Sequence, residues 1–130
     1  MGKTQEARRG EDQARAQLDS IIEMVEKLDT GTDIEREEAQ TIIHEDPLSV
    51  QVRSGWYSPG SENTKPEEFE ILLCTGGPAA RIIGELNEYL EPETAILQHQ
   101  DWFTPWIDQP LTEEEEEKVL EYCRQFYFEC

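Results

Sequence analysis

The sequence is poor in positive charge, poor in cysteine and without any long apolar run. Only 11 Lys and Arg residues stand against 30 Asp and Glu residues, so the formal net charge is −19. Such an excess repels nucleic acids and anionic membrane surfaces. We therefore expect no direct binding to nucleic acid or membrane, whereas a protein with a large basic cleft would be attracted.

The cysteine pattern and the lack of long apolar runs indicate the cellular compartment of the protein. Cys74, Cys123 and Cys130 are odd in number and share no short spacing, which is typical of free thiols in a reducing compartment. No segment approaches the roughly 20 apolar residues that cross a bilayer. The opening residues MGKTQEARRGEDQARAQ also lack the apolar run of a secretory signal. These features predict a cytoplasmic location.

The remaining composition is that of one folded domain. The hydrophobic fraction of 36% is low, but the apolar residues gather into periodic blocks. We expect a flexible N-terminus over residues 1–10 and a single domain over residues 11–130. Between Ala14 and Leu28, apolar residues recur every three or four positions and predict an amphipathic helix from about Glu11. Its stripe could dock on the domain's own sheet or form the seam of a homodimer.

The rest of the chain predicts one more helix, four strands and a closing helix. Thr32 and Glu35 have the spacing of a capping box, and the helix that follows should end at Asp46, before Pro47, with Ile34, Ala39, Ile42 and Ile43 available to a core. Alternating apolar residues then predict strands over residues 48–56, 68–75, 79–86 and 94–102. The short connections favour an antiparallel meander. The last helix should cover residues 111–128, with a cap at Thr112 and a stripe of Val119, Leu120, Cys123, Phe126 and Tyr127. The expected fold is α+β: a four-stranded antiparallel meander sheet with two N-terminal helices and one C-terminal helix packed on it.

No catalytic or metal motif stands out. CTGGPAARI lacks the GK[ST] of a phosphate loop and is better explained as a tight turn between strands. His99 and Asp101 could face one side of a strand as an acid–base pair or a weak metal site. Two residues without a third ligand or a nucleophile are weak grounds for either. We expect a non-enzymatic protein without metal or cofactor.

The run TEEEEEK at residues 112–118 is the most biased segment. Glutamates in a first helical turn are favoured by the helix dipole, but this accounts for two or three of the five. Residues 1–30 hold 7 acidic and 5 basic side chains, so most of the surplus belongs to the remaining 100 residues. A negative surface that imitates nucleic acid is one explanation, and a solvated surface is the other. Trp and Tyr residues, including Trp56 and Tyr57, could anchor an interface or close the ends of the sheet.

Several blocks of the chain together carry a resemblance. RARAQLDSIIEMVEKL, HEDPLSVQVRSGWYSPG, PEEFEILLCTGGPAARIIGELNEYLEPETA, QDWFTPW and YCRQFYF span nearly the whole sequence. Taken together, they resemble small acidic proteins of proteobacterial phages, plasmids and integrated elements. The resemblance implies an accessory protein of a mobile element, a class that includes anti-CRISPR and anti-restriction proteins, and it implies no catalytic residue.

The composition and the resemblance together predict an inhibitor. The expected partner is a host CRISPR-Cas complex or another nucleic-acid-binding defence nuclease, bound by a monomer or a helix-mediated homodimer. The alternatives are an anti-restriction DNA mimic and a phage structural or regulatory protein that dimerises through its first helix. A hydrolase using His99 and Asp101 is the remaining alternative. The residues expected to contact the partner are Glu113, Glu114, Glu117, Glu121, Glu85, Glu88, Trp102 and Trp106.

Overall fold

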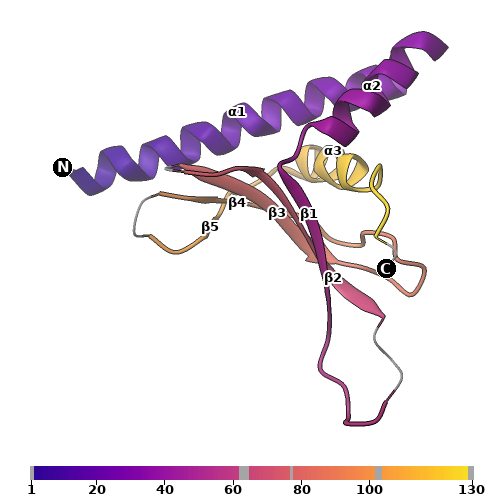
Figure 1. Cartoon of the computed structure of the whole chain (residues 1–130). Coiled ribbons are helices and arrows are strands. Elements are labelled where there is room, and N and C mark those ends of the chain that lie inside the picture. The colour runs from indigo at the N-terminus through magenta and orange to yellow at the C-terminus, as the bar shows by residue number, and fades with distance from the viewer. Residues whose placement is uncertain (1, 62–64, 77, 102–103, 129–130) are drawn as a thin grey trace.

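The protein has an α+β fold, in which helices cover one face of an antiparallel sheet (Figure 1). The computed structural model describes residues 2–61, 65–76, 78–101 and 104–128, with side chains of the first helix described from Arg9 onward. The helices in these segments are α1 (Gly2–Thr30), α2 (Asp33–Glu45) and α3 (Glu113–Cys123). The strands are β1 (Ser49–Ser54), β2 (Pro66–Cys74), β3 (Ala79–Glu85), β4 (Ile96–Gln100) and β5 (Ile107–Asp108).

The predicted meander is confirmed, with one strand more than expected. The strand order is β1-β2-β3-β4-β5, and each neighbouring pair is antiparallel. The fifth strand was missed because it is only two residues long and lies in a segment with Pro105 and Pro110 on either side. So short a strand leaves no alternating pattern to detect.

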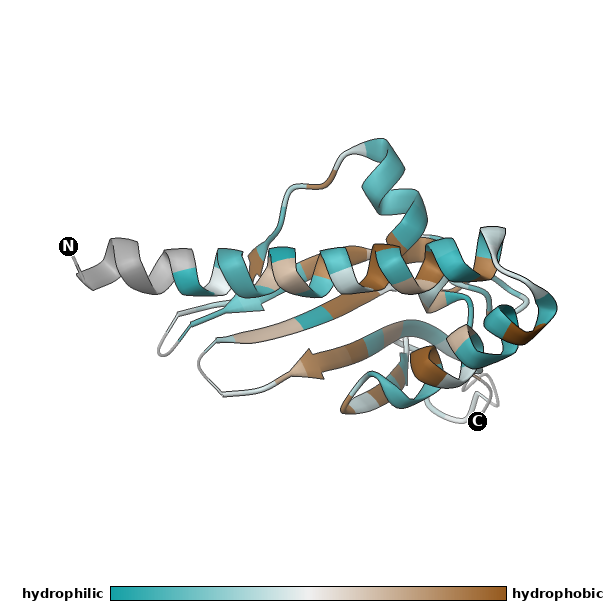
Figure 2. Ribbon diagram, turned by 90° about the horizontal axis from the view of Figure 1, so that it is seen from above, coloured by the Kyte–Doolittle hydropathy of each residue, from teal (hydrophilic) through white to brown (hydrophobic). Residues whose placement is uncertain are grey.

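The first helix is longer than predicted and packs on the sheet. It runs through Gly10 without a break and lies along β3 and β4. The predicted stripe from Ala14 to Val25 is buried in the core. Of the two expected arrangements, these residues therefore adopt docking on the protein's own sheet. This apolar face is therefore not free for a coiled-coil partner. Figure 2 shows the helix lying across the sheet from above. The flexibility expected of residues 1–10 stays a prediction.

The second helix packs chiefly against α1, not on the sheet as expected. Thr32 caps it by accepting a hydrogen bond from the Glu35 amide at 3.3 Å. Ala39 and Ile43 are buried. Ile34 is 70% exposed and Ile42 is 48% exposed, so their predicted place in the core is wrong. A 13-residue helix that packs chiefly against one neighbour has a narrow buried face, here formed by Ala39 and Ile43, one turn apart.

The third helix begins as predicted and ends earlier. Thr112 and Glu115 form the full capping box. The Glu115 amide donates to Thr112 Oγ1 at 3.2 Å, and the Thr112 amide donates to Glu115 Oε1 at 2.9 Å. The helix ends at Cys123, and the chain then turns so that Phe128 packs on Phe69, with ring centroids 5.0 Å apart. Tyr127 is 88% exposed as a result, which corrects the predicted stripe. Tyr122 takes the buried place instead.

Candidate binding surfaces

The densest negative charge lies on α2 and α3, which we call the acidic helix surface. The two helices carry eleven carboxylates and two basic side chains, Arg36 and Lys118. Nine of the carboxylates are exposed, and Glu115 and Glu121 are half-buried. The exposed ones are Asp33, Glu35, Glu37, Glu38, Glu45, Glu113, Glu114, Glu116 and Glu117.

Contacts between the helices hold this surface in place. The Tyr122 hydroxyl donates to Asp46 Oδ2 at 2.7 Å, just after the end of α2. His44 Nε2 lies 2.6 Å from the Gln125 carbonyl, which follows α3. Lys118 Nζ donates to Asp29 Oδ2 at 3.0 Å and joins α3 to the end of α1. Carboxylates on these helices are therefore carried by packed elements, not by loops.

Of the four predicted site residues on α3, three are free and one is not. Glu113, Glu114 and Glu117 are exposed, as a contact surface requires. Glu121 is half-buried and lies against Asp29. Desolvation by burial, together with the hydrogen bond to Asp29 and its negative charge, raises the pKa of Glu121 to about 7. Near neutral pH this residue thus carries less than a full negative charge, and its main contact lies within the protein.

The other two predicted glutamates belong to a different part of the molecule. Glu85 ends β3 and Glu88 lies in the connection to β4, and both are exposed. They line a hollow of about 460 Å³ together with Glu67 and Glu68 of β2. The hollow is formed by the sheet and its connections, so the predicted residues do not form one continuous helical site.

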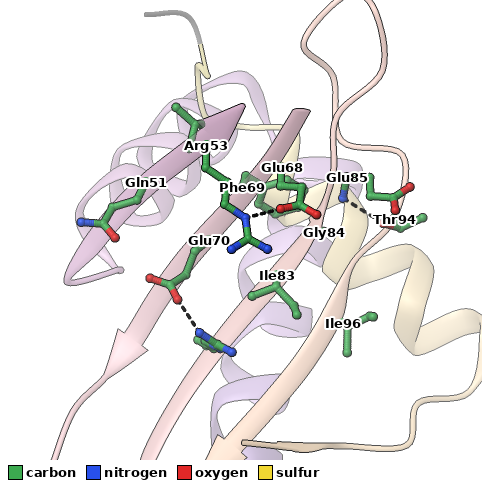
Figure 3. A pocket seen from close by; sticks show the side chains of 12 residues that line it. Gln51, Arg53, Glu68, Phe69, Glu70, Ile83, Gly84, Glu85, Thr94 and Ile96 are labelled. Carbon is green, nitrogen blue, oxygen red and sulfur yellow. Dashed lines mark hydrogen bonds and ion pairs between the residues drawn. The ribbon is translucent and has the colours of Figure 1, made fainter. Parts of the chain in front are cut away.

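The face of the sheet opposite the helices is open and nearly neutral. Its side chains lie in rows across the strands, one of which is Arg53, Glu68 and Glu85 and another Gln51, Glu70, Ile83 and Ile96. Arg53 pairs with Glu68, and Arg81 Nη1 lies 2.6 Å from Glu70 Oε2. These rows line a hollow of about 390 Å³ in the open face (Figure 3). Local pairing thus offsets the charge here, unlike on the acidic helix surface.

The one predicted tryptophan anchor that the structure describes, Trp106, does not lie on the acidic helix surface. Trp102 is outside the described residues. Trp106 is half-buried, and the Arg81 guanidinium stacks 4.2 Å from the centre of its ring, beside the open face. Trp56 is fully exposed and Tyr57 is 53% exposed, both in the loop after β1. Their flanking Gly55 and Pro59 are the signal that marks this pair as a surface loop.

His99 and Asp101 face one side of the sheet, as predicted, but that side is covered. They are 5% and 6% exposed and lie beneath Gly10 of α1. A Cβ atom built on Gly10 would come within 2.6 Å of His99 Nδ1 and 2.8 Å of Asp101 Oδ2. Within the described part of the chain, neither of these two side-chain atoms has a hydrogen-bond partner. The pair is therefore a buried polar contact under a helix and offers no open cleft to a substrate.

Two of the three thiols are sheltered. Burial raises the pKa of both Cys74 and Cys123, so both favour the unreactive thiol form. Cys130 lies outside the described residues. Among the residues that the structure describes, no three His, Cys, Asp or Glu side chains are arranged to hold a metal ion.

Comparison with known proteins does not assign the chain to a family. No protein-family model, curated protein or solved structure matches the chain. Over the described residues, no helix has the length and apolar character needed to span a membrane.

Proposed function

We propose that this protein is a non-enzymatic inhibitor of a host defence complex, in the manner of an anti-CRISPR protein, and that it acts in the cytoplasm of the host bacterium. The acidic helix surface would occupy a Lys- and Arg-lined channel that otherwise holds nucleic acid. The resemblance to small acidic proteins of mobile elements suggests the class of partner. The concentration of charge on packed helices is the observation that carries the mechanism.

The charge density of α3 is roughly half that of duplex nucleic acid. Its eleven residues include five glutamates besides the half-buried Glu121, and eleven helical residues rise about 16 Å. This is one carboxylate per roughly 3 Å, against one phosphate per roughly 1.7 Å of duplex axis. The second helix, whose C-terminal end is hydrogen-bonded to the end of α3, adds five more carboxylates to the negative field. The binding free energy would come from charge complementarity, which also makes it sensitive to salt.

The test compares two charge reversals of equal size. Glu113→Lys/Glu117→Lys alters the acidic helix surface, and Glu91→Lys/Glu93→Lys makes the same charge change at exposed positions between β3 and β4. Phage plaquing is measured on a host with an active CRISPR-Cas system that expresses each variant. We expect the α3 variant to lose protection at least tenfold, while the control keeps most of it. Equal protection by both variants would remove α3 from the mechanism.

An anti-restriction DNA mimic remains the second candidate, because it would use the same surface on a different enzyme. Plaquing on a host with a restriction system and no CRISPR-Cas distinguishes the two. Protection only in the restriction host would transfer the proposal to that partner. In either case, binding to the purified complex should weaken steeply between about 50 and 300 mM NaCl, since screened charges contribute less.

A further inference from the structure

Among the residues that the structure describes, strand β1 has a neighbouring strand on one side only. It is the outermost strand, six residues long, whereas the opposite edge is the two-residue strand β5. A free edge exposes backbone donors and acceptors that can pair with another strand. Proteins commonly protect long edges with charged side chains, prolines or bulges. Here the one charged side chain of β1 is Arg53, which already pairs with Glu68, and the register with β2 shifts only at the end of the strand, between Arg53 and Ser54.

The same edge lies in a segment without acidic residues. Residues 47–61 contain no Asp or Glu, although the whole chain has 30. Two copies with a net charge of −19 each repel one another over most of their surfaces. A contact between copies is therefore least opposed where carboxylates are absent. The edge strand provides such a place.

The edge also exposes apolar side chains. Leu48, directly before the strand, is 60% exposed, and Val50 is 37% exposed. Val50 lies opposite Ile71 and Val52 opposite Phe69, so these valines point to the helix side of the sheet. Strand alternation places Leu48 on the same side. Ser49 and Gln51 point to the open face. A strand laid against β1 would thus cover a short apolar row.

We propose that a second copy of this chain occupies the edge, with the two β1 strands antiparallel about a two-fold axis at Val50. In this register Val50 faces its own copy, and Leu48 faces Val52 of the second chain. Centring the axis on Gln51 instead would place Leu48 opposite Ser54 and leave its side chain without an apolar partner. The self-complementary apolar row favours a second copy over an unrelated strand. The result would be one continuous ten-stranded sheet, twice the five strands of one chain.

The expected association is modest. Two six-residue strands bury less than the roughly 1,200 Å² of a standard interface, so dimers should form at about 10–100 µM protein and not at nanomolar concentration. Because the copies repel electrostatically, added salt should strengthen the dimer. Binding to a basic partner through the acidic helix surface should instead weaken with salt. The two proposals therefore respond in opposite directions and can fail independently.

Sedimentation equilibrium tests the dimer. The wild type should move from the 15.1 kDa monomer toward twice that mass as protein and NaCl concentrations rise. Leu48→Lys should abolish the shift. Ile34→Lys, which makes the same change at the exposed start of α2, should leave it intact. A wild type that stays at 15.1 kDa over the whole range would overturn the proposal, as would equal effects of both variants.

Cysteine crosslinking tests the register. In a Cys130→Ser background, Val50→Cys should form a disulfide-linked dimer under mild oxidation, because the axis brings the two introduced thiols together. Gln51→Cys points to the other face and lies opposite Ser49 of the second copy, so it should crosslink at least tenfold more slowly. Faster crosslinking through position 51 would contradict the proposed register, and so would capture of another protein's strand in place of a second copy.

Discussion

At the scale of single residues, Gly10 decides where the first helix can lie. A glycine inside a helix normally costs about 1 kcal/mol relative to alanine, so the position needs a reason. His99 and Asp101 occupy the space that a side chain would fill. Both side chains are buried between the sheet and α1. The absence of a side chain therefore allows α1 to approach β4 closely.

This close approach gives the first prediction. Helix propensity alone says that Gly10→Ala should stabilise the protein by about 1 kcal/mol. The clash with His99 and Asp101 predicts the opposite sign, a loss of about 1–3 kcal/mol in the free energy of unfolding. Urea denaturation measures it. In a His99→Ala background the loss should shrink, because the nearest obstructing atom is gone. A stabilised single variant would show that α1 does not rest on this pair.

At the scale of elements, the joint between α1 and α3 depends on protonation. Lys118 and Glu121 both meet Asp29 at the end of α1. The hydrogen bonds from Glu121 and Lys118 lower the pKa of Asp29, while desolvation and the contact with Asp29 raise that of Glu121. The two carboxyls thus act as one pair that favours a single proton. Its pairing with Asp29 explains why Glu121 is not a free member of the acidic helix surface.

The pair makes stability depend on pH. The pKa of Glu121 in the folded protein, about 7, lies above its ordinary value of 4.5. Its contribution to stability is therefore complete below pH 4.5 and is lost as the pH rises through 7. Glu121→Gln stays neutral, so it should be more stable than the wild type at pH 8, by about 1 kcal/mol once solvent screening is allowed for.

Denaturation between pH 4 and pH 8 measures this effect, a range above the lowered pKa of Asp29. The difference between Glu121→Gln and the wild type should disappear only as the pH falls toward 4, below the ordinary pKa of 4.5, because Glu121 is then protonated in both the folded and the unfolded protein. Glu117→Gln, at an exposed position on the same helix, serves as the matched control and should keep the wild-type profile. A pH-independent difference for Glu121→Gln would mean that the pair does not share a proton.

At the scale of the whole molecule, charge is distributed unevenly. The helices α2 and α3 carry many unpaired carboxylates, while two arginines pair with glutamates on the open face of the sheet. Acidic residues on α1 and the connections between strands add to the negative field. The folded chain brings these charges closer than the unfolded chain does, so their repulsion opposes folding.

Salt should therefore stabilise this protein. Raising NaCl from about 20 to about 500 mM shortens the screening length from roughly 20 to roughly 4 Å, and we expect the melting temperature to rise by several degrees. Calorimetry measures the change. The Glu91→Lys/Glu93→Lys variant, whose net charge is −15 after a change of four from −19, should respond less. A melting temperature that falls with salt would contradict net repulsion.

Local sequence patterns determined most of the elements of this protein. The capping residues Thr32 and Thr112, the stripe from Ala14 to Val25 and the alternation in β2 act through neighbours a few residues away, and such interactions can be read from the chain. The acidic surplus was also evident. The α+β class and the antiparallel meander followed from them.

Only the tertiary structure decided which faces are used. Burial of Tyr122 instead of Tyr127, exposure of Ile34 and Ile42, and the early end of α3 depend on where distant elements meet. The same holds for the pairing of Glu121 with Asp29, the stacking of Arg81 on Trp106 and the covering of His99 and Asp101 by Gly10. Each arises from contacts between residues far apart in sequence, and no local period encodes such contacts.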